Sequence, residues 1–437
     1  MGTQLSSMLL GLVDTLMVAR VSVDALGALS LANVWIYGTM MFAQGILMGI
    51  DPIVSQAHGA GDGRRAGLAL QRGIVLAAVL SVPVGVLFWW TDAVLIALGQ
   101  QPELAQDAAA YARVQIVGIP CFLIFATLRH YLQSREIVRP ALWVILAANL
   151  LNAGLNWLLI YGNWGAPALG LVGAGIATAV MRVAVVFGLV GLMLQFRLHA
   201  DAWLPWSRAA YSREGLFEVL RYGLPIALQI SSEIWAFSGA SLLVGWLGPV
   251  PLAAHAVALN LASLAFMAPL GVSIGAVTRV GNLLGAGNPH AAQRAAWVAM
   301  ALGAGVMTIS ALGFVVLRDW LPTLYTADLA VGALCATILP IAAAFQIFDG
   351  IQVVACGVLR GMGRVRPAMV FNLISYWLLG LPIGAWLTFR MGWGVGGIWW
   401  GLCFGLGIVA ALFLAWIFWR GPARMGSGPS VRPVAAR

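Results

Sequence analysis

One glycine-rich stretch occurs twice in the chain, and this duplication limits the possible folds more than any other feature. Residues 45–62 read GILMGIDPIVSQAHGAGD, and residues 271–288, which lie 226 positions further on, read GVSIGAVTRVGNLLGAGN. At an offset of 227, residues 138–141 and 365–368 both read VRPA. Two collinear blocks at nearly the same offset, in a chain of 437 residues, indicate a duplicated half-molecule. We therefore expect two lobes of similar fold.

Composition places these two lobes in a membrane. Hydrophobic residues make up 61% of the chain, charged residues make up 9%, and the mean hydropathy is +0.92. A soluble globular protein carries roughly a quarter charged residues. The four cysteines lie inside apolar runs without a C-x-x-C pair, which predicts neither a disulfide nor a metal site.

Apolar runs long enough to span a bilayer occur six times in each half of the chain. A spanning helix needs about 20 mostly apolar residues. The runs are 4–21, 33–57, 70–95, 111–134, 141–162 and 169–196, then 222–247, 253–284, 293–318, 331–358, 367–389 and 394–419. Because each half has an even number of spans, both halves begin on the same side of the membrane. This arrangement predicts a parallel repeat, with the two halves related by an axis along the membrane normal. The expected fold is an all-α integral membrane protein of about 12 transmembrane helices in two pseudo-symmetric six-helix lobes.

The repeat and the polar segments together predict the domain boundaries. We expect an N-terminal lobe at 1–197, a cytoplasmic linker at 198–220, a C-terminal lobe at 221–420 and a disordered cytoplasmic tail at 421–437, because the tail is rich in Gly, Pro and Arg. The repeat equivalent of Pro225 falls before Met1, so we expect either a first span that is shorter at its start by about half to one helical turn or a start of the chain that is assigned too far downstream.

The basic residues indicate which side of the membrane each turn faces. All 24 are arginine, and they give a formal charge of +9. They gather in alternate turns, for example at Arg64, Arg135 and Arg364, whereas the opposite turns hold few. The positive-inside rule then puts both termini and both Gly-Ala-Gly turns of this multi-pass protein in the cytoplasm. We interpret the charge as topological, and we expect no nucleic-acid partner.

Three acidic residues inside predicted spans are the first candidates for function. A charge at the bilayer centre costs about 2.5–3.5 kcal/mol on insertion scales, so a charged residue inside a span is a candidate for a functional role. Glu233 and Asp349 have polar neighbours within about a helical turn, namely Gln229 and Gln346. Two acids in one lobe favour binding of a proton or a small cation such as Na⁺. For Asp14, in the first span, a hydrogen bond between helices remains the alternative.

Other polar and aromatic residues fit more than one interpretation. Asn152 and Asn156 share a helix face, and they are either interhelical hydrogen-bond partners or a polar wall of a substrate cavity. Trp35 and Phe345 are candidates for an aromatic wall around a planar cation, although packing is the alternative for any single ring. Arg182 either pairs with an acid or reaches to the membrane interface, and we favour the second interpretation.

No motif of catalysis or nucleotide binding occurs in the sequence. A phosphate-binding G-x-x-x-x-G-K-[ST] loop is impossible because the chain has no lysine, and the Gly-Ala-Gly turns are better interpreted as helix C-terminal turns. The five histidines show no metal-ligand spacing, and no serine nucleophile motif occurs. We expect no enzyme activity, no cofactor and no metal, except for Na⁺ at the two acids of the second lobe.

In these residues the chain resembles the multidrug and toxic compound extrusion family, specifically its NorM-like bacterial branch. The similar segments are VDTLMVAR, GILMGIDPIVSQAHGAGD and LNWLLIYG with APALGLVGAGIATA in the first half. In the second half they are LPIALQISSEIWAF, LGAGN and FQIFDGIQVVACGVLRGMGRVRPA. The resemblance covers essentially the whole chain.

The resemblance implies a secondary antiporter that exports cationic, often aromatic, drugs in exchange for H⁺ or Na⁺ by alternating access, from a cavity between the lobes. Glu233 and Asp349 stand where this branch keeps its cation-binding acids, and Asp14 stands where the family keeps its first-helix carboxylate. Members with a proton site in the first lobe carry N-x-x-x-D in the fifth span, whereas here Asn152 is followed by Asn156. This departure favours coupling through Glu233 and Asp349. The expected partners are small organic cations and the lipid bilayer, and we expect a monomer.

Two alternatives remain open. A flippase for a lipid-linked or polysaccharide precursor belongs to the same broad superfamily and needs a cationic cavity for phosphates, to which Arg182 and Arg279 would contribute. A membrane-embedded enzyme or receptor scaffold is disfavoured by the missing catalytic motif and by the duplication.

Overall fold

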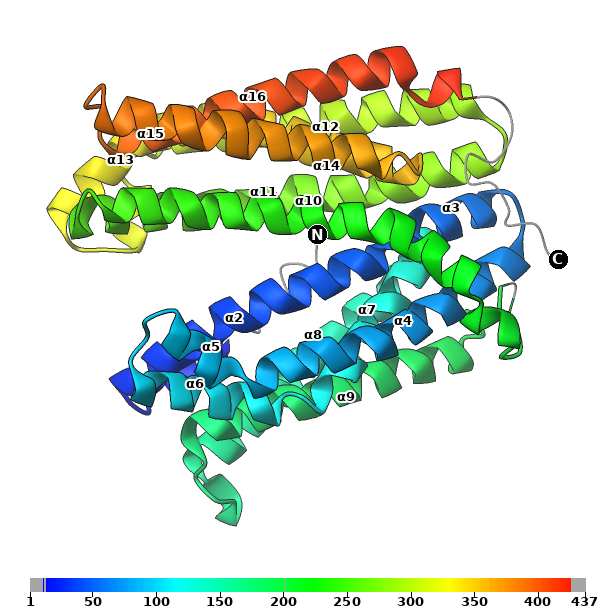
Figure 1. Ribbon diagram of the computed structural model, residues 1–437, viewed down its shortest axis with the longest axis horizontal. Helices are drawn as coiled ribbons and strands as arrows, with labels where there is room; N and C mark the ends of the chain where they lie inside the picture. Colours follow the sequence, from blue (N-terminus) through cyan, green and yellow to red (C-terminus); the bar gives the residue numbers. More distant parts are fainter. Residues whose placement is uncertain (1–10, 12, 201, 426–437) are drawn as a thin grey trace. The chain divides into compact units, whose positions relative to one another are not determined.

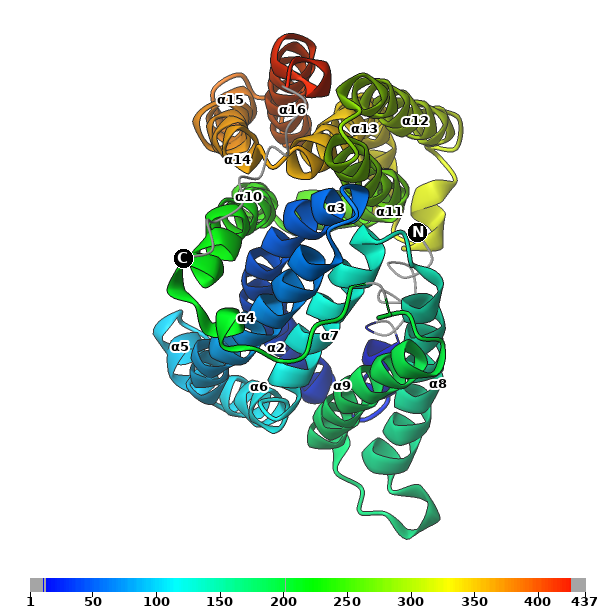
Figure 2. The same ribbon diagram turned by 90° about the vertical axis from the view of Figure 1, so that its right-hand side faces the viewer.

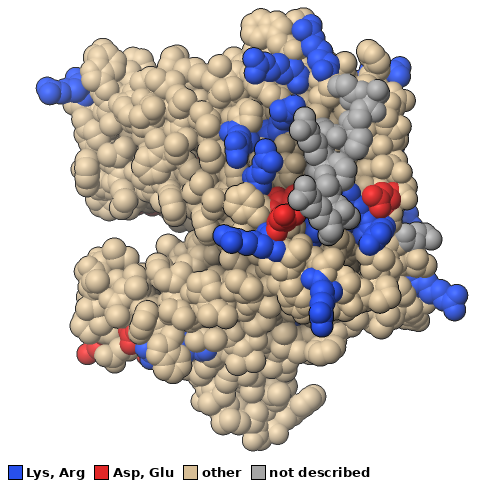
Figure 3. All heavy atoms as spheres, turned by 45° about the vertical axis from the view of Figure 1, so that its right-hand side comes forward, with Lys and Arg blue, Asp and Glu red and all other residues tan. Residues whose placement is uncertain are grey.

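The computed structural model describes residues 11, 13–200 and 202–425, and these residues form helices joined by short turns, with no β-strand among them (Figure 1). In hydrocarbon each backbone N–H and C=O must find its partner within its own segment, which an apolar run of about 20 residues achieves as a helix. Charged side chains are few, and they form separate groups on a surface that is otherwise uncharged (Figure 3).

The helices confirm the predicted spans. Within the described residues, 10 helices are long and apolar enough to cross a membrane, and a bent pair raises the number to 11. These 11 correspond to the second to twelfth predicted spans. The first predicted span, 4–21, begins outside the described residues, and residues 13–18 of it are helical.

The first half contains five of these spans, and two of the five are interrupted. α6 and α7 together form the bent pair, with an angle of 59° between them. The elements are α2 (Val23–Leu47), η1 (Met48–Ile50), α3 (Asp51–Gly59), α4 (Gly63–Trp89), α5 (Thr91–Ala97), α6 (Pro102–Val114), α7 (Gly118–Ser134), α8 (Arg139–Tyr161), η2 (Asn163–Gly165) and α9 (Gly170–Gln195).

The second half contains six spans. Its first helix begins at Arg213, so the last part of the predicted linker 198–220 is already helical. The elements are η3 (Arg208–Tyr211), α10 (Arg213–Gly245), α11 (Pro249–Gly285), α12 (Pro289–Val316), η4 (Leu321–Leu324), α13 (Leu329–Gly361), α14 (Val365–Leu373), η5 (Ile374–Gly380), α15 (Leu381–Phe389), α16 (Val395–Arg420) and η6 (Pro422–Arg424). The rest of the predicted tail, from residue 426, lies outside the described residues.

The chain forms two compact units. The N-terminal unit contains the described residues up to Val54 and those from Asp62 to Ala227, and the C-terminal unit contains Ser55–Gly61 and the described residues from Leu228 onward. A short piece of the first half, at the end of α3, is therefore part of the C-terminal unit. The predicted domain boundaries remain predictions.

The turns repeat between the two halves in detail. Gly61 and Gly287 both have a left-handed backbone, with φ of 70° and 71°. Directly after them, Asp62 and Asn288 cap the next helix by accepting a hydrogen bond from the N–H three residues on. A left-handed residue after a helix is the usual C-terminal stop, and Gly adopts it without steric cost. The interpretation of the Gly-Ala-Gly motifs as helix-terminal turns is confirmed.

The duplicated motif also packs against itself within the C-terminal unit, where the end of α3 crosses α11 (Figure 2). A Cβ added to Gly59 would lie 1.9 Å from the carbonyl oxygen of Asn282, and one added to Gly285 would lie 2.0 Å from that of Gln56. At the offset of 226, Gly59 is equivalent to Gly285 and Gln56 to Asn282, so the contact is reciprocal. Glycine allows the two backbones to approach closely, as small residues generally do in membrane helix pairs.

Candidate functional site

The two acids of the C-terminal unit lie together, and an amide links them to a third helix. Glu233 is on α10 and Asp349 on α13, and they interact electrostatically. Gln352, which is on the same helix as Asp349, donates from Nε2 to Glu233 Oε2 at 3.5 Å and to Asn372 Oδ1 of α14 at 3.1 Å. Among the described residues, neither acid has a basic partner within 4.0 Å. The two acids that the sequence singled out therefore lie close enough to interact, and their role in ion coupling remains a prediction.

A π-helical turn brings a tyrosine to these acids. In η5 the N–H of Leu381 bonds to the carbonyl of Tyr376, five residues back. Pro382 follows, and because it has no N–H it cannot continue the α-helical pattern. Such turns are frequent at functional sites. Tyr376 is fully buried and interacts with both acids, and the adjacent Ser375 Oγ has no hydrogen-bond partner in the described part of the chain.

Buried amides and a thiol extend the same site. Gln229 on α10 donates to Cys356 Sγ at 3.1 Å. Gln346, on α13, is completely buried, and neither its amide nitrogen nor its oxygen has a partner among the described residues. Leaving a buried polar group unpaired costs about 1–3 kcal/mol. A site with several such groups is suited to binding water, an ion or a polar ligand.

Aromatic rings adjoin the acidic site. Phe345 is buried and packs edge-to-face on Trp399 and on Phe237, with ring centroids 5.7 and 6.0 Å apart. Phe237 in turn contacts the Tyr376 ring at 5.9 Å. The other predicted aromatic residue, Trp35, lies in the N-terminal unit, where its Nε1 donates to the carbonyl of Leu87 at 3.4 Å. No contact of the described structure joins Trp35 to any of the three acids.

The first-span acid has its own polar cluster in the N-terminal unit. Asn156 Nδ2 donates to Asp14 Oδ1 and, at 3.1 Å, to Asn152 Oδ1, so both predicted asparagines of α8 belong to the cluster. Thr178 of α9 donates to the other Asp14 oxygen at 3.4 Å. Asn152 Nδ2 and Asn156 Oδ1 are buried without a partner in the described residues. The interhelical hydrogen bond that was the alternative for Asp14 and for the asparagines is therefore present.

Arg182 corrects one interpretation. We expected it to reach to the membrane interface, but the residue is 8% exposed and lies over the ring of Phe122, with the guanidinium carbon 5.3 Å from the ring centroid. It interacts electrostatically with Asp14 and Tyr111. The interfacial interpretation was wrong because Arg182 lies one helical turn after Thr178 on α9, and this face of the helix is turned into the unit rather than toward lipid.

Sequence reasoning missed four residues of these clusters: Asn372, Tyr376, Cys356 and Thr178. Their types are common in packed helices, so polarity alone gave no signal. For Tyr376 one signal was available, because Pro382 in the middle of an apolar run indicates a break in the helix about one turn earlier. For the other three, only the meeting of helices distant in sequence reveals the site.

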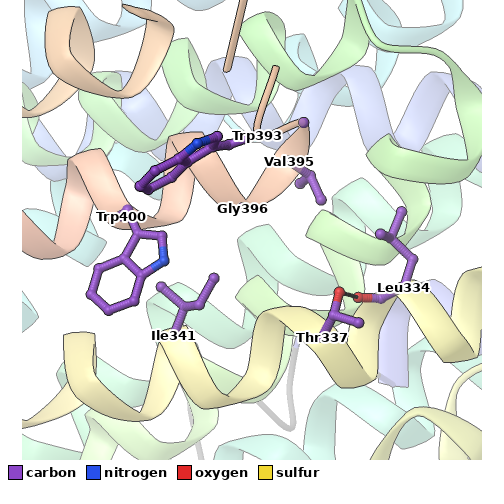
Figure 4. Close-up of a pocket in the computed structure, with 8 residues that line it drawn as sticks. Leu334, Thr337, Ile341, Trp393, Val395, Gly396 and Trp400 are labelled. Atoms are coloured by element: carbon purple, nitrogen blue, oxygen red, sulfur yellow. Dashed lines mark hydrogen bonds between the residues drawn. The ribbon is translucent and has the colours of Figure 1, made fainter. Parts of the chain in front are cut away.

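A separate hollow in the C-terminal unit contains none of these residues. It has a volume of about 380 Å³ and lies between the start of α13 and the start of α16 (Figure 4). Trp393, Trp400 and Ile341 line much of it, and the hydroxyl of Thr337 is bonded to the carbonyl of Leu334. No acidic or basic side chain lines it, so it offers an apolar surface and no ion site.

The MatE family model matches residues 1–158 and 225–386, which is most of the chain and includes all three acids. The chain belongs to the MatE family. Among curated proteins, this MatE chain is 34% identical over 418 residues to the "Probable multidrug resistance protein NorM" of Mesorhizobium japonicum, covering 92% of this chain and 87% of that one. It is 31% identical over 427 residues to the "Multidrug resistance protein NorM" of Aliivibrio fischeri, covering 95% and 92%.

Solved structures show the same fold. The MatE chain matches the crystal structure of a eukaryotic MATE transporter with a TM-score of 0.87 and 25% sequence identity, over 97% of this chain and 94% of that one. The predicted family resemblance and the predicted two-lobed helical fold are therefore confirmed. The chain is a multi-pass membrane protein of a transporter family.

Proposed function

We propose that this MatE-family chain is a secondary active antiporter that exports cationic, aromatic organic compounds in exchange for H⁺ or Na⁺ by alternating access. The observation that carries the proposal is the pair Glu233 and Asp349, two acids on adjoining helices of one unit with no basic partner among the described residues. The relatives named as multidrug resistance proteins support this substrate class.

The chemistry of the pair requires a cation. Two carboxylates in a shared low-dielectric site cannot both stay ionised without compensation, because desolvation and mutual repulsion both oppose the charged forms. A proton, a sodium ion or the cationic group of a substrate can each supply the missing charge. Because they neutralise the same carboxylates, binding of one weakens binding of the others, and this competition is the coupling that an antiporter needs.

The groups around the pair suit both ligands. Gln352 and Gln346 present amide groups that can bond a hydrated ion or a polar substituent. Phe345, Phe237 and Tyr376 present ring edges and faces beside the acids, and aromatic faces attract organic cations. The chain has no lysine, and no guanidinium of the described residues lies within 4.0 Å of either acid, so the pair is net acidic, which favours cations over the phosphate of a lipid-linked precursor.

In this proposal Asp14 is a second acid with a lesser part in coupling. It already accepts hydrogen bonds from Asn156 and Thr178 and interacts with Arg182, so part of its charge is compensated by the protein itself. Asn152 and Asn156 then form a polar wall beside it. The carrier is proposed to work as a monomer in the bacterial inner membrane with both termini in the cytoplasm.

The test is transport by the purified protein in proteoliposomes loaded with a cationic fluorescent dye. A pH gradient alone is imposed first, and a Na⁺ gradient alone second. Asp349→Asn and Glu233→Gln remove one charge each, and Asp319→Asn serves as the matched control because that acid is exposed in the same unit.

We expect one of the gradients to drive dye movement in the wild type and in Asp319→Asn, and to fail in the other two variants. Wild-type transport by both Asp349→Asn and Glu233→Gln would contradict the assignment of the pair. If no gradient moves the dye but the protein scrambles a fluorescent phospholipid, the flippase alternative is correct instead.

A further inference from the structure

The second span is broken at one point, and a buried pair formed by an aspartate and a histidine lies at the break. α2 ends at Leu47, and α3 begins at Asp51 after the short turn η1. Pro52 has no N–H for the preceding turn, which explains why regular α-helical bonding is interrupted here. Shortly afterwards, between Val54 and Ser55, the chain passes from the N-terminal to the C-terminal unit. The break therefore lies a few residues before the point where the chain passes from one unit to the other.

This aspartate–histidine pair joins the break to α7. Asp51 Oδ1 lies 3.0 Å from Nδ1 of His130, and each side chain is only 7% exposed. A carboxylate can only accept, so Nδ1 of His130 carries the hydrogen of this bond. Nε2, on the other side of the ring, is buried and has no hydrogen-bond partner in the described residues. This nitrogen is a buried base with an open lone pair.

The neighbouring charges favour a proton over a metal ion. Arg129, directly before His130 on α7, interacts electrostatically with Asp51. The Asp51 carboxylate thus already interacts with the Arg129 guanidinium and the His130 imidazole. The positive charge of Arg129 opposes binding of a metal cation at the same place. A histidine, in contrast, ordinarily gains and loses a proton between about pH 5 and 8.

The duplicated half shows that the fold does not require this pair. At the offsets of 226 and 227, Val277 stands in place of Asp51 and Gly357 in place of His130. Gly357 packs so closely that an added Cβ would lie 2.5 Å from the carbonyl oxygen of Ser273. The second half therefore solves the same packing problem with small and apolar residues. A buried charged pair in the first half alone needs a reason other than folding.

We propose that Asp51 and His130 form a proton-binding latch at the break in the second span, and that a proton taken from water onto His130 Nε2 tightens the attachment of η1 and the start of α3 to α7. Binding of the proton converts the hydrogen bond from neutral His130 to the Asp51 carboxylate into an ion pair. Release of the proton to water restores the neutral imidazole. The latch is a site separate from the acidic pair of the proposed antiporter, and it does not depend on what the carrier transports.

Several charged groups on the helices around His130 have partners of their own, whereas Asp24 on α2 and Arg64 on α4 are exposed. On α7, Arg135 is bonded to the hydroxyl of Tyr131 and to the carbonyl of Leu198. On α4, which packs on α7, Arg65 and Arg72 both pair with Glu218. On α9, Arg182 interacts with Asp14 and Tyr111. The pairs of Arg135, Arg65, Arg72 and Arg182 are made with other residues, and Asp51 interacts with His130 and Arg129.

The experiment measures amide hydrogen exchange of the full-length protein without substrate. Exchange of the segment 44–54 is followed by mass spectrometry at about pH 5.5 and about pH 7.5, on either side of the usual histidine range, and corrected for the intrinsic effect of pH. The wild type should exchange about fivefold more slowly at the lower pH, because a hydrogen bond between two charged groups contributes about 1 kcal/mol more than a bond with a neutral partner.

His130→Gln keeps a donor of similar size but cannot take up the proton, so its segment should exchange at the same corrected rate at both pH values. Asp51→Asn removes the carboxylate and should also lose the pH effect, which keeps the test informative if the first variant does not fold. His290→Gln is the matched control, since His290 is exposed at the start of α12. A wild type without the pH effect, or a His130→Gln variant that retains it, would overturn the proposal.

Discussion

Gly285 offers a sharp test of the reciprocal contact between the two copies of the duplicated motif. Replacing it with alanine adds one methyl group on α11. That methyl would lie 2.0 Å from the carbonyl oxygen of Gln56 and 3.0 Å from the backbone nitrogen of Ala60. Both neighbours are backbone atoms of the first copy, so neither can turn away as a flexible side chain would. The helices must move apart for the variant to fold.

The size of the effect follows from comparison with a second glycine on the same helix. A Cβ at Gly275 meets nothing within 4 Å. There, alanine should stabilise by about 0.5–1 kcal/mol, because it loses less backbone freedom on forming a helix. Forcing one methyl into a close-packed contact costs about 1–3 kcal/mol. Because the backbone gain applies at both of these helical positions, it cancels in the comparison, and we expect Gly285→Ala to have a free energy of unfolding about 1–3 kcal/mol below that of Gly275→Ala.

The assay is thermal unfolding of the two purified variants in the same detergent, followed by tryptophan fluorescence and by the monodisperse fraction on size exclusion. Gly59→Ala should behave like Gly285→Ala, since its methyl meets the carbonyl oxygen of Asn282 at 1.9 Å. If Gly285→Ala unfolds at the same temperature as Gly275→Ala, the two copies of the motif do not pack against each other as described.

Three further changes test other parts of the structure. Gln352→Leu removes the amide that bonds Glu233, and gradient-driven dye transport should fall by about tenfold or more at equal protein yield, since a bond to a charged group contributes about 1.5–3 kcal/mol. Glu218→Gln removes the carboxylate that pairs with Arg65 and Arg72 of α4. The free energy of unfolding, measured by chemical denaturation, should fall by about 1–3 kcal/mol. An unchanged denaturation curve would contradict a stabilising role for these two ion pairs. Asn156→Asp places a second carboxylate beside Asp14, and the two carboxylates can be accommodated only if they share a proton. Because that proton is lost as the pH rises, the unfolding temperature of the variant should fall with increasing pH more steeply than that of the wild type.

Periodicity and polarity were sufficient to predict the second to twelfth spans of this fold. Runs of apolar residues marked the second to twelfth spans, and the offset between the two Gly-Ala-Gly motifs predicted turns that prove to have nearly the same backbone angles at Gly61 and Gly287. The cost of charge in hydrocarbon singled out Glu233 and Asp349, which do lie together. These inferences depend on local composition and on the hydrocarbon of the bilayer, in which polar and charged groups are energetically costly and therefore rare.

The missing parts depend on which helix faces meet. Sequence spacing showed that Asn152 and Asn156 share a face of α8, but not that this face meets Asp14 and Thr178. Sequence spacing could not show that Arg182 points into its unit. A long basic side chain in an apolar helix can either pair with an acid inside the protein or extend to the membrane interface. The π-helical turn that brings Tyr376 to the acids changes the register within a single helix, and a regular helical projection does not predict it.

The reciprocal glycine contact has the form of a subunit interface. In a two-fold symmetric dimer, each residue on one copy meets its partner on the other, and the reverse contact is made as well. Gly59 against Asn282 and Gly285 against Gln56 satisfy this condition inside one polypeptide. A half-length chain carrying this motif could associate with its own copy through the same surface. Joining two such copies into one gene would then make a permanent dimer, in which each half is free to acquire its own set of charged residues.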